Sequence, residues 1–481
     1  MKKRPLRQWV GFGSALLLLG LILSACGPVP ENDSGNVSLG DDESEFSYQQ
    51  SAQTSVNTKI KAKPPAATSS TTATFKFSCT AGKCTYKCQL DGGAWTKCKS
   101  GITYPGLGQI THTFKVKATG DRSPAKYSWT IGNMTQISAG RLTSCGLLST
   151  GGFICWGYND SGQLGNGTKT DSNIPRNVSG LSSGGFAISA SNGAHSCALP
   201  GAAKCWGDNY WGQLGDGTTT SHKVPTDVSG ISSGGSAISA GYNHTCAIVS
   251  GAAKCWGQNL YGQLGDGTTT NHKLPTSVTG LSSGVSAISA ATSHTCAIIS
   301  GAAKCWGFGN DGRLGDGKAT ESNVPVAVTG LSSGVSAISA GGSHTCAVVS
   351  GAAKCWGYNL SGQLGNGNNT WSASPVSVSG LSSGVSAISA GGDHSCAIVS
   401  GAVKCWGANS GGQLGDGTNT GSNVPVPVSG LTSGASAISA GYSQACAIVS
   451  SVPMCWGSNN SGELGNGTNT NSNVPVNIWG F

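Results

Sequence analysis

The sequence predicts an all-β protein in which a small β-sandwich is followed by a seven-bladed β-propeller. A segment that opens with Ile-Ser-Ala recurs seven times, with a period of 50 residues and one spacing of 51. Inside each unit, apolar runs of about 4–6 residues are bounded by Gly, Ser and Asn, which is typical of strands. Four such runs in a period near fifty predict one propeller blade per unit. The units open at Ile137, Ile188, Ile238, Ile288, Ile338, Ile388 and Ile438.

The start of the chain, residues 1–25, has the pattern of a secretory signal peptide. Four basic residues precede an apolar run, 11–25, that is too short to span a bilayer. The tetrapeptide at 23–26, Leu-Ser-Ala-Cys, resembles the bacterial lipobox, in which the cysteine is alkylated by diacylglycerol and becomes the mature N-terminus. We therefore expect lipidation of Cys26 and a place in the bacterial cell envelope, as an outer-membrane lipoprotein or at the cell surface. The alternative is an ordinary cleavage site beside a chance cysteine.

The segment that follows, residues 26–71, changes in composition. It is rich in Ser, Thr, Asn, Asp and Gln and has few large apolar residues. Such a segment cannot bury enough apolar surface to fold, so it is predicted to be a disordered tether behind the lipidated cysteine.

A second alternating pattern, in residues 72–133, predicts the sandwich. Its Cys, Leu-Asp-Gly, Trp, Cys and His-x-Phe-x-Val-x-Ala elements resemble those of bacterial immunoglobulin-like domains. The resemblance implies a bridge between Cys88 and Cys98, which leaves Cys79 to pair with Cys84.

Each repeat contributes two cysteines, and an even number in a secreted chain implies disulfides. In the third unit, a two-residue turn at Ser250-Gly251 would place Cys246 opposite Cys255 in a non-hydrogen-bonded pair, where facing residues come closest. Zinc bound by His244 and both cysteines is the alternative, but zinc needs four ligands and a unit offers three at most. The predicted bridges, with no metal, are Cys145–Cys155, Cys197–Cys205, Cys246–Cys255, Cys296–Cys305, Cys346–Cys355, Cys396–Cys405 and Cys446–Cys455.

The sequence motifs of the repeat resemble those of a known family. The motifs His-Thr-Cys-Ala at 244–247, Cys-Trp-Gly-Gln-Asn at 255–259 and Gly-Gln-Leu-Gly-Asp-Gly at 262–267 resemble the repeat of the regulator of chromosome condensation family. The likeness covers residues 134–481 and implies a seven-bladed propeller. We expect the ring to close by mixing its ends, with the last strands completing a blade beside the first ones.

Charge weighs against nucleic acid as a partner of the propeller. Residues 134–481 carry 12 Lys and Arg against 12 Asp and Glu, whereas residues 72–133 carry nine basic residues against Asp91 and Asp121. DNA affinity depends on neutralised phosphates, and no basic stripe occurs in the repeats. The basic residues of the small domain indicate either a solvated face or contact with anionic lipid headgroups or polysaccharide.

Neither an enzyme nor a cofactor is expected. The Ser and His residues recur in every unit, so no single constellation of acid, base and nucleophile stands out. The Gly-rich turns do not precede a helix, which argues against a phosphate-binding loop.

The loops that follow Cys-Trp-Gly vary between units and are therefore the candidate binding surface. Large aromatic residues lie in these loops and in other connecting segments, where Tyr242, Tyr442 and Trp371 occur. Tyr and Trp dominate binding hot spots, although such rings also cap sheet edges. An arc of candidate partner-binding residues is predicted at Tyr210, Trp211, Tyr242, Tyr261 and Phe308.

Together these observations predict a monomeric surface lipoprotein, held at the membrane by its lipid anchor, whose propeller is a platform for an unknown protein or glycan. The family resemblance implies an alternative, a regulator of a partner enzyme that acts as a guanine-nucleotide exchange factor or as a β-lactamase inhibitor. A third alternative is a purely structural surface protein.

Overall fold

The computed structural model describes residues 56–481, and the predicted signal peptide and Cys26 lie outside the described residues. Within residues 56–481, no helix has the length and apolar character needed to cross a membrane.

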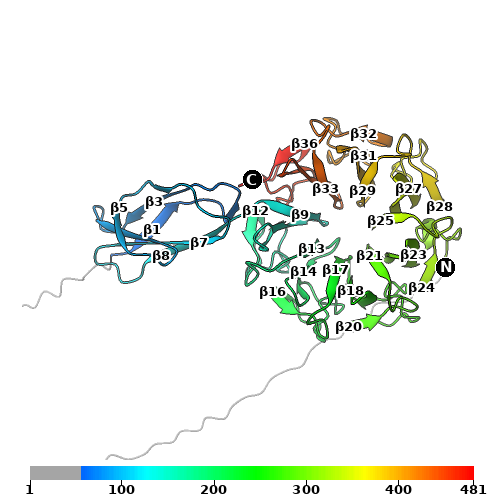
Figure 1. The fold of residues 1–481 in the computed structure, drawn as a ribbon, viewed down its shortest axis with the longest axis horizontal. Coiled ribbons are helices and arrows are strands. Elements are labelled where there is room, and N and C mark those ends of the chain that lie inside the picture. The colour runs from blue at the N-terminus through cyan, green and yellow to red at the C-terminus, as the bar shows by residue number, and fades with distance from the viewer. Residues whose placement is uncertain (1–55) are drawn as a thin grey trace, which may run out of the picture. The chain divides into compact units, whose positions relative to one another are not determined.

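The small domain consists of two sheets (Figure 1). The three-stranded sheet has the order β1-β3-β6 and the five-stranded sheet the order β2-β8-β7-β4-β5. Their bounds are β1 Thr58–Ala62, β2 Ala67–Thr68, β3 Ala73–Cys79, β4 Tyr86–Leu90, β5 Thr96–Cys98, β6 Ile102–Tyr104, β7 Thr111–Ala118 and β8 Ala125–Ile131. An aromatic core joins the sheets, with Phe75 stacked on Phe114 at 4.0 Å between ring centroids and Trp129 fully buried beside them.

The predicted boundary between tether and sandwich at residue 71 is wrong. Strands β1 and β2 lie before it, β1 paired antiparallel with β3 and β2 paired parallel with β8. The cause is local: in Thr-Lys-Ile-Lys-Ala the lysines alternate with Ile60, which pairs with Phe77 and packs against the core. That short alternation is hidden by the polar composition around it.

Residues 134–481 form seven four-stranded antiparallel sheets, here numbered 1 to 7 in chain order, set around a common centre (Figure 1). The first strand of each sheet carries Ile-Ser-Ala and faces the centre, since the first strands contact one another. The first strands are β9 Met134–Ala139, β13 Ala187–Ala190, β17 Gly235–Ala240, β21 Val285–Ala290, β25 Val335–Ala340, β29 Val385–Ala390 and β33 Ala435–Ala440.

The other three strands of each sheet follow in sequence order toward the outside. The second strands are β10 Thr143–Leu148, β14 His195–Leu199, β18 His244–Val249, β22 His294–Ile299, β26 His344–Val349, β30 His394–Val399 and β34 Gln444–Val449. The third strands are β11 Phe153–Gly157, β15 Lys204–Gly207, β19 Ala252–Gly257, β23 Ala302–Gly307, β27 Ala352–Gly357, β31 Ala402–Gly407 and β35 Val452–Gly457. The fourth strands are β12 Ser172–Asn177, β16 His222–Asp227, β20 His272–Ser277, β24 Ser322–Ala327, β28 Ser372–Ser377, β32 Ser422–Pro427 and β36 Ser472–Asn477. The short 3-10 helix η1 Asn310–Gly312 lies in the loop between β23 and β24.

The turn between the second and third strands sets the register of each sheet. In sheet 3, Ser250 and Gly251 both have positive φ, of 51° and 80°, as a two-residue hairpin turn of the primed type requires. The turn pairs Val249 with Ala252, and counting outward it pairs Cys246 with Cys255, as the sequence predicts.

The predicted mixing of the chain ends within one sheet is wrong. Sheet 1 is built from β9–β12 and sheet 7 from β33–β36, each from consecutive strands, because one repeat counted from Ile-Ser-Ala already contains all four strands. The two sheets are neighbours that meet through packing and side-chain bonds. Trp156 Nε1 donates to the carbonyl of Glu463 at 2.8 Å, the bond that Trp206 makes to Gln163 one sheet further on.

Candidate functional site

Nine disulfides occur in the described residues, in the predicted pairs. The seven in the sheets each join the second strand to the third, with Cα atoms about 4 Å apart, as facing residues of a non-hydrogen-bonded pair are. All fourteen of these cysteines are fully buried, and their sulfur atoms face the next sheet, as where Cys145 Sγ lies 3.9 Å from the hydroxyl of Ser196.

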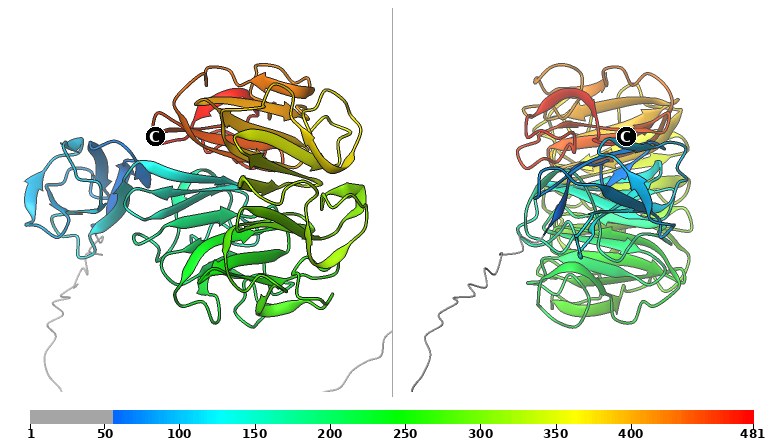
Figure 2. Two further views of the ribbon diagram at one scale, coloured as in Figure 1. Left: turned by 45° about the vertical axis from the view of Figure 1, so that its right-hand side comes forward. Right: turned by 90° about the vertical axis from the view of Figure 1, so that its left-hand side faces the viewer.

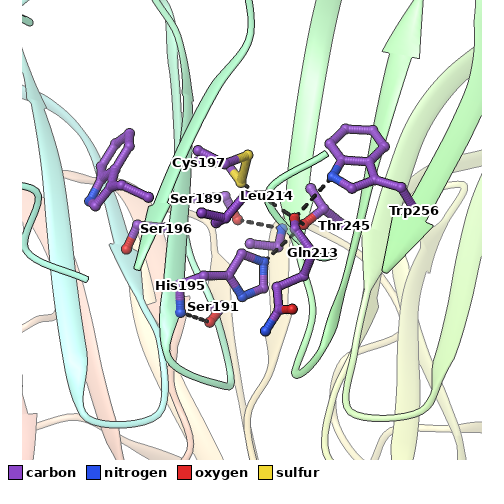
Figure 3. The surroundings of a disulfide bond; sticks show 12 residues. Ser189, Ser191, His195, Ser196, Cys197, Gln213, Leu214, Thr245 and Trp256 are labelled. Atoms are coloured by element: carbon purple, nitrogen blue, oxygen red, sulfur yellow. Dashed lines mark hydrogen bonds between the residues drawn. A yellow bond between two sulfur atoms is a disulfide. The ribbon is translucent and has the colours of Figure 1, made fainter. Parts of the chain in front are cut away.

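A hydrogen-bonded network beside the Cys197–Cys205 bridge joins sheet 2 to sheet 3 (Figure 3). His195 of sheet 2 contacts the hydroxyl of Thr245 in sheet 3, with Nε2 and Oγ1 2.9 Å apart. That hydroxyl donates to the carbonyl of Gln213 at 2.8 Å, and Trp256 Nε1 donates to the same carbonyl at 2.9 Å. Because the hydroxyl proton is used on Gln213, His195 must donate from Nε2, which fixes the tautomer and leaves Nδ1 as an acceptor.

The histidine network varies at the two ends of the repeat series. Among the described residues, His394 has no hydrogen-bond partner on either ring nitrogen, because Ala445 replaces the hydroxyl residue in sheet 7. Gln444 takes the histidine position of sheet 7 and donates from Nε2 to the carbonyl of Gly140 at 3.0 Å. Among residues 56–481 no group of three His, Cys, Asp or Glu side chains could hold a metal ion. Four histidines act as hydrogen-bonding groups between sheets, namely His195, His244, His294 and His344.

Acid is expected to destabilise the ring through these histidines. Burial lowers the pKa of His195, His244 and His344 to about 3 and that of His394 to about 4. Between pH 6.5 and these values the unfolded chain binds more protons than the folded one, so the free energy of unfolding falls as the pH is lowered. Each histidine contributes at most about 1.4 kcal/mol per pH unit in that window. Melting temperatures between pH 7 and pH 5 measure the effect.

A matched variant isolates the histidine contribution. In His244→Gln, which copies the residue found at position 444, we expect the same fold and a shallower dependence of melting temperature on pH. An unchanged slope would assign the acid sensitivity to other groups.

The variable loops all emerge at one face of the ring. In an antiparallel sheet of four consecutive strands, the turn between strands one and two and the loop between strands three and four lie at the same end. Connections accordingly gather on both faces of the ring (Figure 2). We call the face with these turns and third-to-fourth-strand loops the loop face, and all five residues of the predicted arc lie on it.

The structure brings the predicted arc together as two ring pairs rather than as one continuous row. Tyr210 packs edge-on against Trp211 of the same loop, with centroids 5.1 Å apart. Tyr261 of sheet 3 packs against Phe308 of sheet 4, with centroids 4.8 Å apart. Tyr210 is 71% exposed and Tyr261 37%, so each pair offers one open ring to a partner.

Tyr242 contacts Arg141, a residue that the sequence analysis missed. Arg141 Nη1 donates to the Tyr242 hydroxyl at 3.1 Å, and its guanidinium also lies 5.4 Å from the centre of the Tyr442 ring. All three residues follow a first strand, so they lie near the centre of the loop face. The available signal was Arg141 itself, the one basic residue at a position held elsewhere by Asn192, Tyr242, Thr292, Gly342, Gly392 and Tyr442.

Comparison with known proteins identifies the repeat. The family model described as the regulator of chromosome condensation (RCC1) repeat matches residues 151–199, 204–248, 251–298, 301–348, 351–398 and 400–448, and a second model of the same description matches 134–163 and 236–263. No curated protein matches the sequence.

Solved structures resemble the fold at low sequence identity. Human WBSCR16 is 22% identical with a TM-score of 0.59, over 69% of this chain and 92% of that one. Yeast RCC1 (Prp20), solved bound to Kap60, is 19% identical with a TM-score of 0.60, over 72% of this chain and 85% of that one. Prp20p from Saccharomyces cerevisiae, solved in work on its binding to Gsp1p and histones, is 20% identical with a TM-score of 0.55, over 64% and 80%.

Proposed function

Because the chain belongs to the regulator of chromosome condensation (RCC1) repeat family, we propose that its seven sheets are the blades of a propeller whose loop face binds a macromolecular partner. The observation that carries this proposal is the concentration of half-open aromatic pairs, Tyr210 with Trp211 and Tyr261 with Phe308, on one face. Tyr and Trp supply much contact area at low entropic cost, which suits a protein partner. Catalysis and nucleic-acid binding are not part of the proposal.

The partner-binding prediction is tested with full-length protein used as bait in a cell-envelope extract. Once a bound protein is identified, Tyr261→Ala is expected to cost about 2 kcal/mol or more of binding free energy, a loss of about thirtyfold in affinity, because a hot-spot ring is removed. Phe186→Ala is the matched control, since this 42% exposed ring lies in the connection from the fourth strand to the next first strand, on the opposite face. Unchanged affinity in both Tyr210→Ala and Tyr261→Ala would remove the arc from the binding surface.

The remaining parts of the chain fit display at a bacterial cell surface. We propose that Cys26 is acylated and that the small domain is immunoglobulin-like and separates the ring from the membrane. Its nine basic residues against two acidic ones in 72–133 suit a place near anionic headgroups.

The anchor is tested by detergent-phase partitioning. Wild-type protein is expected in the detergent phase and Cys26→Ser in the aqueous phase, because several acyl chains each contribute about 0.8 kcal/mol per buried methylene. Equal partitioning of the two proteins would contradict acylation.

A further inference from the structure

Two hollows lie side by side on the loop face, away from the aromatic pairs. The larger, of about 620 Å³, lies between sheets 5 and 6 and is lined by Leu360 and Asn369 on one side and by Asn409 and Asn423 on the other. The smaller, of about 250 Å³, lies between sheets 6 and 7 and is lined by Asn471 and Asn473 among others. Ser410 and Asn419 line both hollows, so the two form one track across three sheets.

Asn419 differs from its counterparts in the neighbouring sheets, Asn369 and Asn469. The amide of Asn369 donates to the carbonyl of Leu360 and accepts from Asn423. Asn469 likewise donates to the carbonyl of Asn460 and accepts from Asn173. Between sheets 6 and 7 this arrangement is broken, because Asn473 donates to the carbonyl of Gly417 instead.

As a result, the side chain of Asn419 makes no hydrogen bond within residues 56–481, and neither does the hydroxyl of Ser410. An amide has two donors and an acceptor with two lone pairs, and a hydroxyl both donates and accepts. Both residues are exposed and line both hollows, so the track offers donors and acceptors that are not used within the protein at its midpoint.

The track has no charged lining. The loops 357–371, 407–421 and 457–471 contain no Lys or Arg, and their only acidic residues are Asp416 and Glu463. Asp416 accepts from the backbone and hydroxyl of Thr418, and Glu463 is fully buried. A phosphate or sulfate group would need basic partners, and a hard cation would need carboxylates, so the chemistry of the lining selects an uncharged polar ligand.

A tryptophan lies one junction before this track, where sheet 4 meets sheet 5. Positions 371, 421 and 471 are equivalent by the 50-residue period, and Gly421 and Asn471 line the larger and the smaller hollow. Trp371 occupies the same position one sheet earlier and is 49% exposed. Its ring lines neither hollow, but it offers an open apolar surface at the next junction, which suits an extended ligand with apolar CH faces and hydroxyl edges.

We propose that this track binds a neutral oligosaccharide, with its hydroxyl groups on Asn419 and Ser410 and one sugar ring against Trp371. Vicinal hydroxyls both donate and accept, so they match a free amide next to a free hydroxyl. The larger hollow, of about 620 Å³, lies within the size range of small-ligand sites, and the polar lining of both hollows favours a polar ligand over an apolar one. This site is separate from the aromatic pairs and does not depend on the protein partner proposed above.

The test uses full-length protein titrated by calorimetry with cellohexaose, maltohexaose and chitohexaose, and with dextran sulfate as a charged probe. We expect at least one neutral hexasaccharide to bind and dextran sulfate not to bind at this site. Asn419→Ala and Trp371→Ala should each weaken that binding at least tenfold. Asn469→Ala, the equivalent amide that is already hydrogen-bonded to Asn173, should bind as the wild type does.

Two further measurements separate the outcomes. Melting curves of all variants show whether the fold is retained, and Tyr261→Ala should keep the wild-type affinity for the oligosaccharide even if it loses a protein partner. The proposal is overturned if no neutral hexasaccharide binds, if binding survives both Asn419→Ala and Trp371→Ala, or if only dextran sulfate binds.

Discussion

Reduction and alkylation of the chain in denaturant is expected to leave a protein that does not refold when the denaturant is removed. Each bridge of the ring closes a short loop, with the cysteines 8 to 10 positions apart. By the loop-entropy account, a bridge over so short a loop stabilises by somewhat under ~3 kcal/mol. Seven such contributions exceed the ~5–15 kcal/mol by which a typical folded chain is stable. Circular dichroism and tryptophan fluorescence after alkylation measure the loss.

Reduction without denaturant is the control for this experiment. The fourteen ring cysteines are fully buried, so dithiothreitol is expected to leave their bridges intact while Cys79 and Cys84, which are only partly buried, become available for alkylation. A double Cys79→Ser, Cys84→Ser variant should then show an unchanged ring. Native spectra in the fully reduced and alkylated protein would contradict a major stabilising role for the bridges.

Replacement of Trp256 by alanine is expected to destabilise the ring by ~3–5 kcal/mol, the usual cost of removing a large buried aromatic side chain. The indole belongs to sheet 3 yet packs against Leu199 and Leu214 of sheet 2, so the cavity would open between sheets. The variant also loses the bond from Nε1 to the carbonyl of Gln213, which would then accept from Thr245 alone. Urea unfolding measures the change.

Trp211→Ala provides the matched control for Trp256→Ala. Trp211 lies on the loop face against Tyr210 rather than between sheets, so we expect its replacement to change the free energy of unfolding by no more than ~0.5 kcal/mol. Similar losses in the two variants would show that the indoles between sheets do not hold the ring together.

The repeated sheets could be predicted from the sequence because the same pattern of apolar runs and turns recurs in all seven units. The Cys246–Cys255 pairing followed from counting outward from the turn at Ser250, which depends only on strand alternation. Strand β1 was missed because the single large apolar residue among its lysines, Ile60, is too weak a signal without its partner Phe77. The end mixing was mispredicted because a repeat period alone does not say which strand begins a sheet.

The candidate sites were harder to predict because they depend on differences between sheets. Aromatic residues in loops could be selected by type, but the contact of Tyr261 with Phe308 joins two repeats and is set by how neighbouring sheets pack. Nothing in the sequence distinguishes Asn419 from Asn369 and Asn469, the equivalent residues of the neighbouring units. Its free amide arises because Asn473 takes another acceptor, a choice between two hydrogen bonds that the residue names do not reveal.

The contacts between neighbouring sheets are nearly the same at every junction. These contacts therefore do not determine how many sheets the ring contains. His244 meets Thr295 as His294 meets Thr345, and the carbonyls of Gln213 and Gln263 accept the same two donors. Loss of one whole unit from the middle would join surfaces that already fit each other. Within residues 56–481, the series meets its own start where sheet 7 joins sheet 1, through contacts such as Gln444 with Gly140 and Trp156 with Glu463. The number of repeats is therefore set by the rotation from one sheet to the next, which must add up to a full turn. A change in that number would disturb the fit between the last sheet and the first.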